Sequence, residues 1–353
     1  MLYVGLDLHA RTFSVVALKT SGTVLFEATH ATSCERLREV IGGLRGPKRV
    51  ALEETTMAAW AYRVLKPCAT EVVVAEPWHN RLIGKDEKCD DLAAARKLAD
   101  LLRGNFLHPV HHTDDLDRQA FKELVLSYHD TVRELTRAKN RLKGKFRQHG
   151  LVCGDGTVYR DDEREGWLAQ LPHPSVRWQV EQLYGDLDHL AAKQARMVSA
   201  IRRQARAIPP IRRFQAVPGV GPIRAATFYA ILDDPHRFAD KRRVWTYCGL
   251  GVVRRKSGEK AGPEHLTRHG HPRLKDIAKG AAATAIAAGE NAFGQQHARL
   301  RAAGVKPESA RLTVARAIVS TLWAMWRDDA PYHPRTAATP MPWPPQPTRR
   351  CIA

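Results

Sequence analysis

Three short β-rich runs separated by tight turns open the chain and limit the folds that its first hundred residues can adopt. The runs cover residues 2–7, 12–18 and 23–28. Links of about three residues between consecutive strands predict an antiparallel meander. Helical and strand patterns then alternate: strands are predicted at 49–53 and 70–75, and helices at 34–41, 57–65 and 91–103. Residues 1–110 are therefore expected to form one α/β domain.

Hairpin strands followed by β-α units are typical of an RNase H-like domain, although many α+β folds would satisfy the same order. Asp7 lies in the first run among apolar neighbours, Glu53 closes the fourth run, and Asp91 opens the last helix. Two of them have an ordinary alternative: Asp7 could face solvent on an edge strand, and Asp90 or Asp91 could cap the helix. In an RNase H-like fold the three acids can converge. Such oxygen ligands suit Mg²⁺, in a two-metal site about 4 Å across that promotes phosphoryl transfer.

Two long helical patterns follow. Apolar residues recur at alternating steps of four and three through 121–146 and 176–201, and a Gly- and Pro-bearing stretch joins the two segments. This spacing predicts two heptad-patterned helices that form an antiparallel hairpin or coiled-coil arm over residues 111–210. A plain helical bundle is the alternative. Gly185, inside the second helix, could allow a bend.

The remaining chain divides at Pro209-Pro210. Residues 211–329 read as a mostly α-helical, Ala-rich domain, and the Pro-rich residues 330–353 are expected to be disordered. The segment Val217-Pro218-Gly219-Val220-Gly221-Pro222 precedes an apolar helix and is similar to the hairpin of a helix-hairpin-helix element. Gly219 and Gly221 would let the backbone approach a phosphate. Glycines used only for a turn are the alternative.

The charge balance indicates a polyanionic partner. Lys and Arg total 56 against 37 Asp and Glu, a formal charge of +19. Such an excess favours nucleic acid, through counterion release from phosphates, over a ribosomal or membrane surface. The chain has no bilayer-spanning apolar run, no signal-peptide layout at its start and only scattered cysteines, so we expect a cytoplasmic protein that acts at the nucleoid, without a membrane partner.

Much of the positive charge lies on the two long helices. The first helix carries seven cations within fifteen residues, opposed only by Glu134: Arg133, Arg137, Lys139, Arg141, Lys143, Lys145 and Arg147. The second helix and the stretch after it carry Arg202, Arg203, Arg206, Arg212 and Arg213 without an acid among them. Single-signed runs favour phosphate binding over a merely solvated face, and either RNA or DNA would fit.

Seven sequence blocks are similar to those of one family, and the resemblance covers nearly everything from residue 3 to about 327. They are YVGLDLH, VALEETT, CDDLAAARKLADLLR, VPGVGPIRAATFYAIL, FADKRRVWTYCGL, RRKSGEK and LTRHGHPRLKDIA. The chain resembles the DEDD transposases of the insertion-sequence one-hundred-and-ten family, recombinases guided by a bridge RNA. The resemblance implies a RuvC-like N-terminal domain, with Asp7 as the first family acid, Glu53 as the second (Glu54 is the alternate) and Asp91 as the third.

The fourth acid of the family pattern is missing. The family segment is of the type D-x-x-D-A-R-K-L, and the position three residues after Asp91 is Ala94. Three explanations are open: Asp90 substitutes, the chain is a naturally decayed copy, or alanine was introduced in place of aspartate. We prefer the third. If either the second or the third explanation holds, we expect a chain that binds nucleic acid and cleaves poorly, with a weakened Mg²⁺ site.

A serine in the C-terminal region is the candidate nucleophile. Ser257 lies among cations that could stabilise the charge that develops on a phosphodiester: Arg254, Arg255, Lys256 and Lys260. From the residues alone this segment reads as a basic turn. The resemblance implies that Ser257 attacks a DNA phosphate and forms a covalent phosphoserine, in a composite site built between protomers. Arg268 and Arg273 are further candidate phosphate contacts, and His265, His269 and His271 are interpreted as phosphate-facing or structural rather than zinc ligands.

The sequence thus predicts a site-specific recombinase that acts on donor and target DNA with a structured guide RNA, as a homodimer or tetramer. The helix over residues 133–147 and the N-terminal domain surface are the predicted RNA contacts. Two alternatives stay open. One is a non-catalytic nucleic-acid-binding relative, and the other is a junction-specific nuclease that uses water and never uses Ser257.

Overall fold

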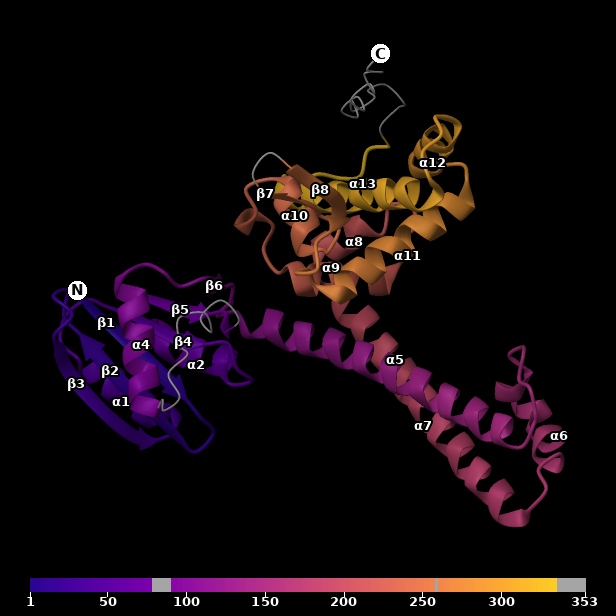
Figure 1. The fold of residues 1–353 in the computed structure, drawn as a ribbon, viewed down its shortest axis with the longest axis horizontal. Coiled ribbons are helices and arrows are strands. Elements are labelled where there is room, and N and C mark those ends of the chain that lie inside the picture. Colours follow the sequence, from indigo (N-terminus) through magenta and orange to yellow (C-terminus); the bar gives the residue numbers. More distant parts are fainter. Residues whose placement is uncertain (78–89, 258–259, 335–353) are drawn as a thin grey trace. The chain divides into compact units, whose positions relative to one another are not determined.

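A computed structural model describes residues 1–77, 90–257 and 260–334, with only the backbone described for 254–257 and 260–264. The chain divides into two compact units, Met1–Gln119 and Ala120–Ala353 (Figure 1). The predicted disordered tail lies outside the described residues from 335 onward. Among the described residues, no helix is long and apolar enough to cross a lipid bilayer.

A six-stranded mixed sheet, in the order β3-β2-β1-β4-β5-β6, forms the centre of the first unit (Figure 1). The strands are β1 (Leu2–Leu8), β2 (Thr12–Leu18), β3 (Val24–Ala31), β4 (Lys48–Glu53), β5 (Glu71–Ala75) and β6 (Pro109–Val110). The predicted meander is confirmed, since β1, β2 and β3 pair antiparallel. β4 runs parallel to β1, and β5 runs parallel to β4. This topology is compatible with the predicted RNase H-like fold. The two-residue strand β6 is not among the predicted strands.

Helices cover both faces of the sheet: α1 (Cys34–Gly43), α2 (Ala58–Leu65) and α4 (Asp91–Arg103). Strand alternation decides which face each residue joins. Leu6 and Leu52 pack with α1 and α2 in one core, whereas Ala51 packs with α4 in another. Asp7 and Glu53 each lie two positions beyond a residue of the α4 side, Gly5 and Ala51. Both acids are therefore directed to the face that α4 covers.

Gly5 sets the distance between α4 and β1. A Cβ atom built on Gly5 would lie 1.8 Å from the carbonyl oxygen of Ala95 and 2.6 Å from the amide nitrogen of Ala99, both in α4. Any other side chain would therefore force the helix off the strand. The glycine in YVGLDLH thus permits the backbone contact that brings the N-terminus of α4 toward Asp7.

We expect Gly5→Ala to lower the free energy of unfolding by about 3 kcal/mol or more, the upper range for overpacking, because the clashing atoms belong to the backbone. Urea unfolding of the two proteins measures this difference. Gly42→Ala is the matched control, since a Cβ at Gly42 meets nothing within 4 Å. Equal losses in the two variants would contradict the proposed close contact.

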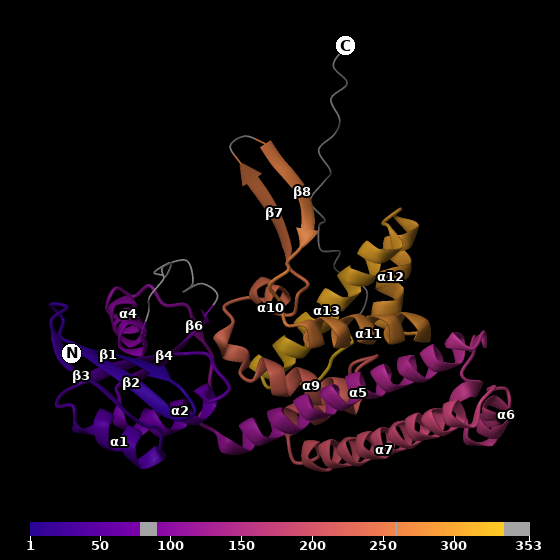
Figure 2. The ribbon, with the colours of Figure 1, turned by 60° about the horizontal axis from the view of Figure 1, so that its bottom comes forward.

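Two long antiparallel helices, α5 (Leu116–Gln148) and α7 (Pro174–Ala205), follow, and Figures 1 and 2 show them side by side. Both belong to the second unit apart from the first four residues of α5. The short helices η3 (Thr157–Tyr159), η4 (Asp161–Glu163) and α6 (Arg164–Ala169) join them at the far end. The predicted helical hairpin is confirmed, and its coiled-coil geometry stays a prediction. α7 continues through Gly185 without a break. The apolar seam of α5 is divided between two cores, one with Phe121 and Val125 and one with Leu142 and Phe146.

The other helices of this unit gather around the core that contains Phe121. They are α8 (Pro209–Phe214), α9 (Pro222–Leu232), η5 (Pro235–Arg237), α10 (Lys241–Tyr247), α11 (Pro272–Ala288), α12 (Ala292–Ala302) and α13 (Pro307–Arg327). Two antiparallel strands, β7 (Val252–Ser257) and β8 (Lys260–Leu266), form a hairpin around Ser257 (Figure 2). The interpretation of this segment as a basic turn did not include the strand β7. The β-branched pair Val252-Val253 was the available sequence signal for this strand.

Candidate active site and nucleic-acid interface

Asp7 is held near the end of the central strand of the sheet. In the β1–β2 register it lies opposite Ser14, a buried residue whose hydroxyl hydrogen-bonds to Thr29 at 2.8 Å. The side chain of Asp7 keeps 22% of its surface exposed. Burial raises the pKa of the Asp7 carboxyl above its usual value; the His9 charge opposes this shift, and the negative charge of Asp91 adds to it. Asp7 is thus a partly buried carboxylate that favours a positive neighbour.

The two aspartates at the N-terminus of α4 have different roles. Asp90 is the N-cap, and its carboxylate accepts a hydrogen bond from the Ala93 amide at 2.7 Å. Such a cap satisfies one of the helix's unpaired amides. Asp91 is the first helical residue, and its carboxylate remains directed toward Asp7. This geometry disfavours Asp90 as the substitute for the missing fourth acid.

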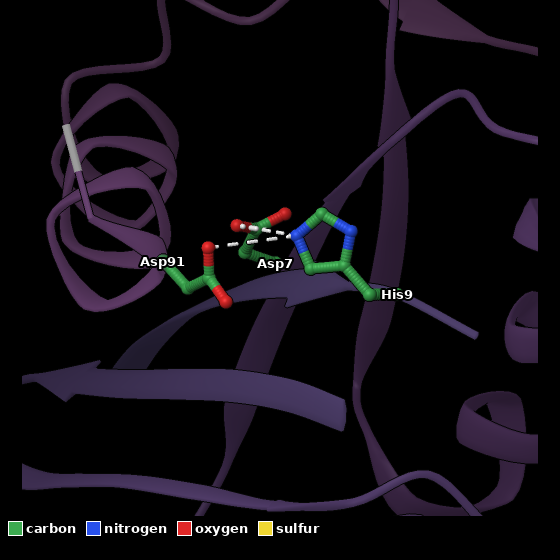
Figure 3. A group of neighbouring side chains, drawn as sticks. All are labelled: Asp7, His9 and Asp91. Carbon is green, nitrogen blue, oxygen red and sulfur yellow. Dashed lines mark ion pairs between the residues drawn. The ribbon is translucent and has the colours of Figure 1, made fainter. Parts of the chain in front are cut away.

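Three side chains converge at this point (Figure 3). The Nε2 atom of His9 lies 3.3 Å from a carboxylate oxygen of Asp7 and 3.7 Å from one of Asp91. One ligand atom from each residue lies within 4.8 Å of the others, so the trio could hold a metal ion. The structure therefore brings together the first and third predicted acids, although 84 residues separate them in the chain.

Sequence reasoning assigned no role to His9. The available signal was its position two residues after Asp7, which directs both side chains to the same side of an extended chain. The backbone of His9 is fixed in the β1–β2 connection, where its amide donates to the Thr12 carbonyl at 2.9 Å and its carbonyl accepts from the Thr32 hydroxyl at 2.9 Å.

The second predicted acid lies next to this trio in the sheet register. The parallel pairing of β1 and β4 ends at Leu6 with Leu52, and Asp7 and Glu53 are the next residues in the two strands. Glu53 is not a member of the trio within 4.8 Å. The alternate residue, Glu54, contacts His112 instead, with 2.5 Å between Oε2 and Nε2. This ion pair engages Glu54 elsewhere and favours Glu53 as the second acid.

Ala94 lies one turn after Asp91 on α4, so the two residues share a face of the helix. Ala94 is partly buried, and its amide donates to the Asp90 carbonyl at 2.9 Å. A carboxylate at this position would be directed to the same side as Asp91. The position of Ala94 is therefore suited to a further acidic ligand, and alanine supplies none.

Ser257 is the last residue of β7 and pairs in register with Lys260 of β8. The backbone thus places the predicted nucleophile at the end of a strand, beside the connection of a hairpin. The side chains of Ser257, Arg254, Arg255, Lys256 and Lys260 lie outside the described residues. Their predicted roles stay predictions.

The seven predicted cations of α5 separate into two groups. Lys139 and Lys143 lie over the ring of Tyr159, at 5.1 and 5.3 Å from its centroid, and Lys145 donates to Gln179 at 3.0 Å. These three residues stabilise the end of the helical hairpin. The other four are exposed arginines: Arg133, Arg137, Arg141 and Arg147. Of these, Arg133 also pairs with Asp130 at 2.7 Å.

A second cationic surface follows the C-terminal half of α7. An open depression of about 620 Å³ lies along this helix. Its lining residues are Gln194, Ala195, Val198, Ser199, Arg202, Arg203 and Arg206. Arg202, Arg203 and Arg206 are exposed, and Arg212 is exposed beyond them. Arg213, by contrast, contacts Asp329 and is partly buried. The depression is concave, and the charged residues that line it are all arginines.

Gly219 has a packing role that the sequence interpretation missed. Its φ angle is +82°, and a Cβ would lie 2.2 Å from the carbonyl oxygen of Ala281 in α11. This glycine therefore permits two segments of the unit to touch. Gly221 is the N-cap of α9, and a Cβ there meets nothing within 4 Å. Of the two predicted phosphate-binding glycines, only Gly221 has open space beside it.

The residues before α11 also differ in exposure. His265, Arg268 and His269 are exposed. His271 is the N-cap residue of α11, and burial, together with the charges of Arg273 and Lys122, lowers its pKa to about 4. Arg273 contacts Asp130 in an ion pair. His271 thus occupies a structural position, whereas Arg268 remains available to a phosphate.

A mixed sheet with two carboxylates and an imidazole gathered at the end of its central strand is compatible with an RNase H-like enzyme that transfers phosphoryl groups with a divalent metal. Two family models match the chain. The DEDD transposase model of IS110 elements matches residues 4–150, and the model described as "Transposase IS116/IS110/IS902 family" matches residues 211–298. The chain belongs to the IS110 family of transposases, and a DEDD family implies an active site that depends on divalent metal.

Relatives support this membership. An uncharacterized 43.6 kDa protein of insertion element IS110 from Streptomyces coelicolor is 30% identical over 293 residues, 69% of this chain and 70% of that protein. The transposase for insertion sequence element IS1111A from Coxiella burnetii is 21% identical over 279 residues, 78% of this chain and 75% of that protein. An uncharacterized 44.8 kDa protein of IS116 from Streptomyces clavuligerus is 31% identical over 125 residues, 35% of this chain and 31% of that protein.

Proposed function

We propose that this chain is a site-specific DNA recombinase of a mobile element, which acts on donor and target DNA with a structured guide RNA. The observation that carries the proposal is the convergence of Asp7 and Asp91, from β1 and α4, in a chain of a DEDD transposase family. Glu53, next to Asp7 in the sheet register, would complete the acidic set.

The donor set fits a divalent cation. Oxygen atoms of the Asp7 and Asp91 carboxylates lie within 4.8 Å of each other. Burial and the negative charge of Asp91 both raise the pKa of Asp7, and a bound cation would relieve the repulsion between the two carboxylates. Asp7, Glu53 and Asp91 would hold Mg²⁺, which suits oxygen ligands. When bound, the metal supplies charge stabilisation at the scissile phosphate and at the leaving oxygen.

Ser257 would be the nucleophile. Its hydroxyl oxygen attacks a DNA phosphorus and forms a phosphoserine ester, while the bond from phosphorus to one strand oxygen breaks and that oxygen leaves as a hydroxyl. The adjacent cations Arg255 and Lys256 would stabilise the charge that develops on the phosphate. The acids and the serine belong to different units of the chain. We propose that they meet between protomers of a dimer or tetramer.

Exposed arginines of α5 would bind the nucleic-acid backbone. Arg133, Arg137 and Arg141 follow each other at four-residue steps, about 6 Å apart along a helix, and Arg147 lies six residues beyond. Exposed arginines at such intervals can contact successive phosphates. The depression along α7, with Arg202, Arg203 and Arg206, would provide a second backbone contact.

Ala94 favours a second candidate, a relative that binds nucleic acid without cutting it. The α4 face that carries Asp91 lacks a carboxylate at its next turn, so the metal site has fewer ligands than the family pattern provides. Such a protein would bind nucleic acid through its phosphate-binding surfaces and would not cleave it. A nuclease that uses water would keep the acids and leave Ser257 unused.

Sequencing of the nucleic acid that copurifies with the protein tests the guided recombinase. We expect one discrete, structured transcript, because a guide must be held specifically to direct cleavage. The same purification from a variant with Arg137, Arg141 and Arg147 changed to serine should lose most of that transcript. A random mixture of cellular RNA and DNA would instead identify a generic binder.

A further inference from the structure

His9 lies close enough to Asp7 and Asp91 to share a metal ion with them. Two ligands at about 2.1 Å from one ion lie about 3.0 Å apart when at right angles and about 4.2 Å apart when opposite. The separations from His9 Nε2 to the carboxylate oxygens of Asp7 and Asp91 are 3.3 and 3.7 Å, inside this range. No large rearrangement is needed for all three atoms to contact one cation.

The local backbone holds His9 in this position. Hydrogen bonds from its amide to Thr12 and from Thr32 to its carbonyl fix the residue at the end of β1. Its side chain keeps 55% of its surface exposed, so solvent and a metal ion can reach the ring. The backbone of His9 is thus fixed beside the two carboxylates, and its imidazole is open to a metal ion.

The ligand set therefore differs from an all-carboxylate one. Ala94 offers no oxygen, and His9 offers a nitrogen close to both Asp7 and Asp91. Mg²⁺ strongly prefers oxygen, whereas imidazole nitrogen favours first-row transition metals. Replacement of an oxygen ligand by a nitrogen ligand therefore shifts the preference of the site from Mg²⁺ toward transition-metal dications.

We infer that His9, through Nε2, is a third ligand of the metal site formed with Asp7 and Asp91, and that this site binds a transition-metal dication such as Mn²⁺ in preference to Mg²⁺. The inference rests on the proposed function for the existence of the site and adds its ligand and its metal preference. The alternative role for His9 is that of a counter-ion, which a metal would displace.

Mn²⁺ binding by the purified protein tests the inference without any DNA. Spin-echo spectroscopy of bound Mn²⁺ should detect coupling to a directly bound ¹⁴N nucleus, and His9→Ala should remove this coupling. The same variant should weaken Mn²⁺ binding at least about tenfold, the usual minimum effect of changing a residue that shapes a metal site. Mg²⁺, measured by competition, should lose less affinity.

His149→Ala is the matched control, because it removes an exposed histidine outside the trio, and it should leave both affinities unchanged. Ala94→Asp should strengthen Mg²⁺ binding and narrow the difference between the two metals. Unchanged or tighter Mn²⁺ binding in His9→Ala, or bound Mn²⁺ without ¹⁴N coupling, would identify a counter-ion and overturn the inference. If only the role of His9 is wrong, wild type still binds the metal and Asp7→Asn abolishes that binding. If the proposed function is wrong, wild type binds no metal.

Discussion

Replacement of Ala94 by aspartate is expected to raise the rate of DNA cleavage at least about 100-fold, which corresponds to about 2.7 kcal/mol of activation free energy. The reason is geometric. Ala94 lies one turn from Asp91 on the helix face that carries the third acid, and Asp90 is engaged as the N-cap. A carboxylate at position 94 would add the missing oxygen ligand without altering the cap. Single-turnover cleavage of donor DNA in Mg²⁺ measures the gain.

Ala93→Asp is the matched control for this experiment. It adds the same charge one residue away, about 100° around the helix, and Ala93 is exposed. We expect no gain in rate from this variant. If wild type already cleaves as fast as Ala94→Asp, the idea of an impaired site is wrong and the ligands already present suffice. Equal gains from both variants would point to a general charge effect.

Ser257→Ala, made on the Ala94→Asp background, is expected to abolish the covalent protein–DNA adduct and to lower cleavage on the order of 10³-fold or more, since loss of a nucleophile removes the chemical step. Ser257 ends β7 next to a cluster of cations in sequence. The adduct would be detected as DNA that remains attached to the protein under denaturing conditions and is released by protease.

Ser309→Ala provides the control, because Ser309 is an exposed serine in the first turn of α13. It should leave both the adduct and the cleavage rate unchanged. The result also separates the candidate functions. Cleavage without an adduct, both with Ser257 intact and after Ser257→Ala, would identify a nuclease that uses water. Nucleic-acid binding without cleavage in the Ala94→Asp protein would identify a non-catalytic relative.

Local patterns were sufficient to predict most of the first unit. Period-two alternation and short links predicted the meander, and the helix over 91–103 was predicted at its observed bounds. These features depend on periodicity and connection length, which are properties of contiguous sequence. The convergence of Asp7 and Asp91 was instead expected from the RNase H-like order of elements, and it arises in the structure because β1 lies inside the sheet and α4 packs across it.

Features that depend on tertiary contacts could not be predicted in this way. Gly219 was expected to approach a phosphate, and its close contact with Ala281, which lies 62 residues later in the chain, is a packing role that the sequence did not indicate. Lys139 and Lys143 were expected to contact phosphates, and their contact with the ring of Tyr159 is a further role that the sequence did not indicate. The choice between Glu53 and Glu54 likewise required His112, which approaches from beyond β6.

The contact at Gly5 has a consequence for how this protein tolerates change over evolutionary time. Main chain touches main chain there, so the spacing between the strand and the helix does not depend on the size or rotamer of any intervening residue. Substitutions elsewhere in the hydrophobic interior can accumulate while the registration of Asp91 against Asp7 is preserved. Copies that drift widely in sequence would keep the same catalytic spacing for as long as that one glycine persists.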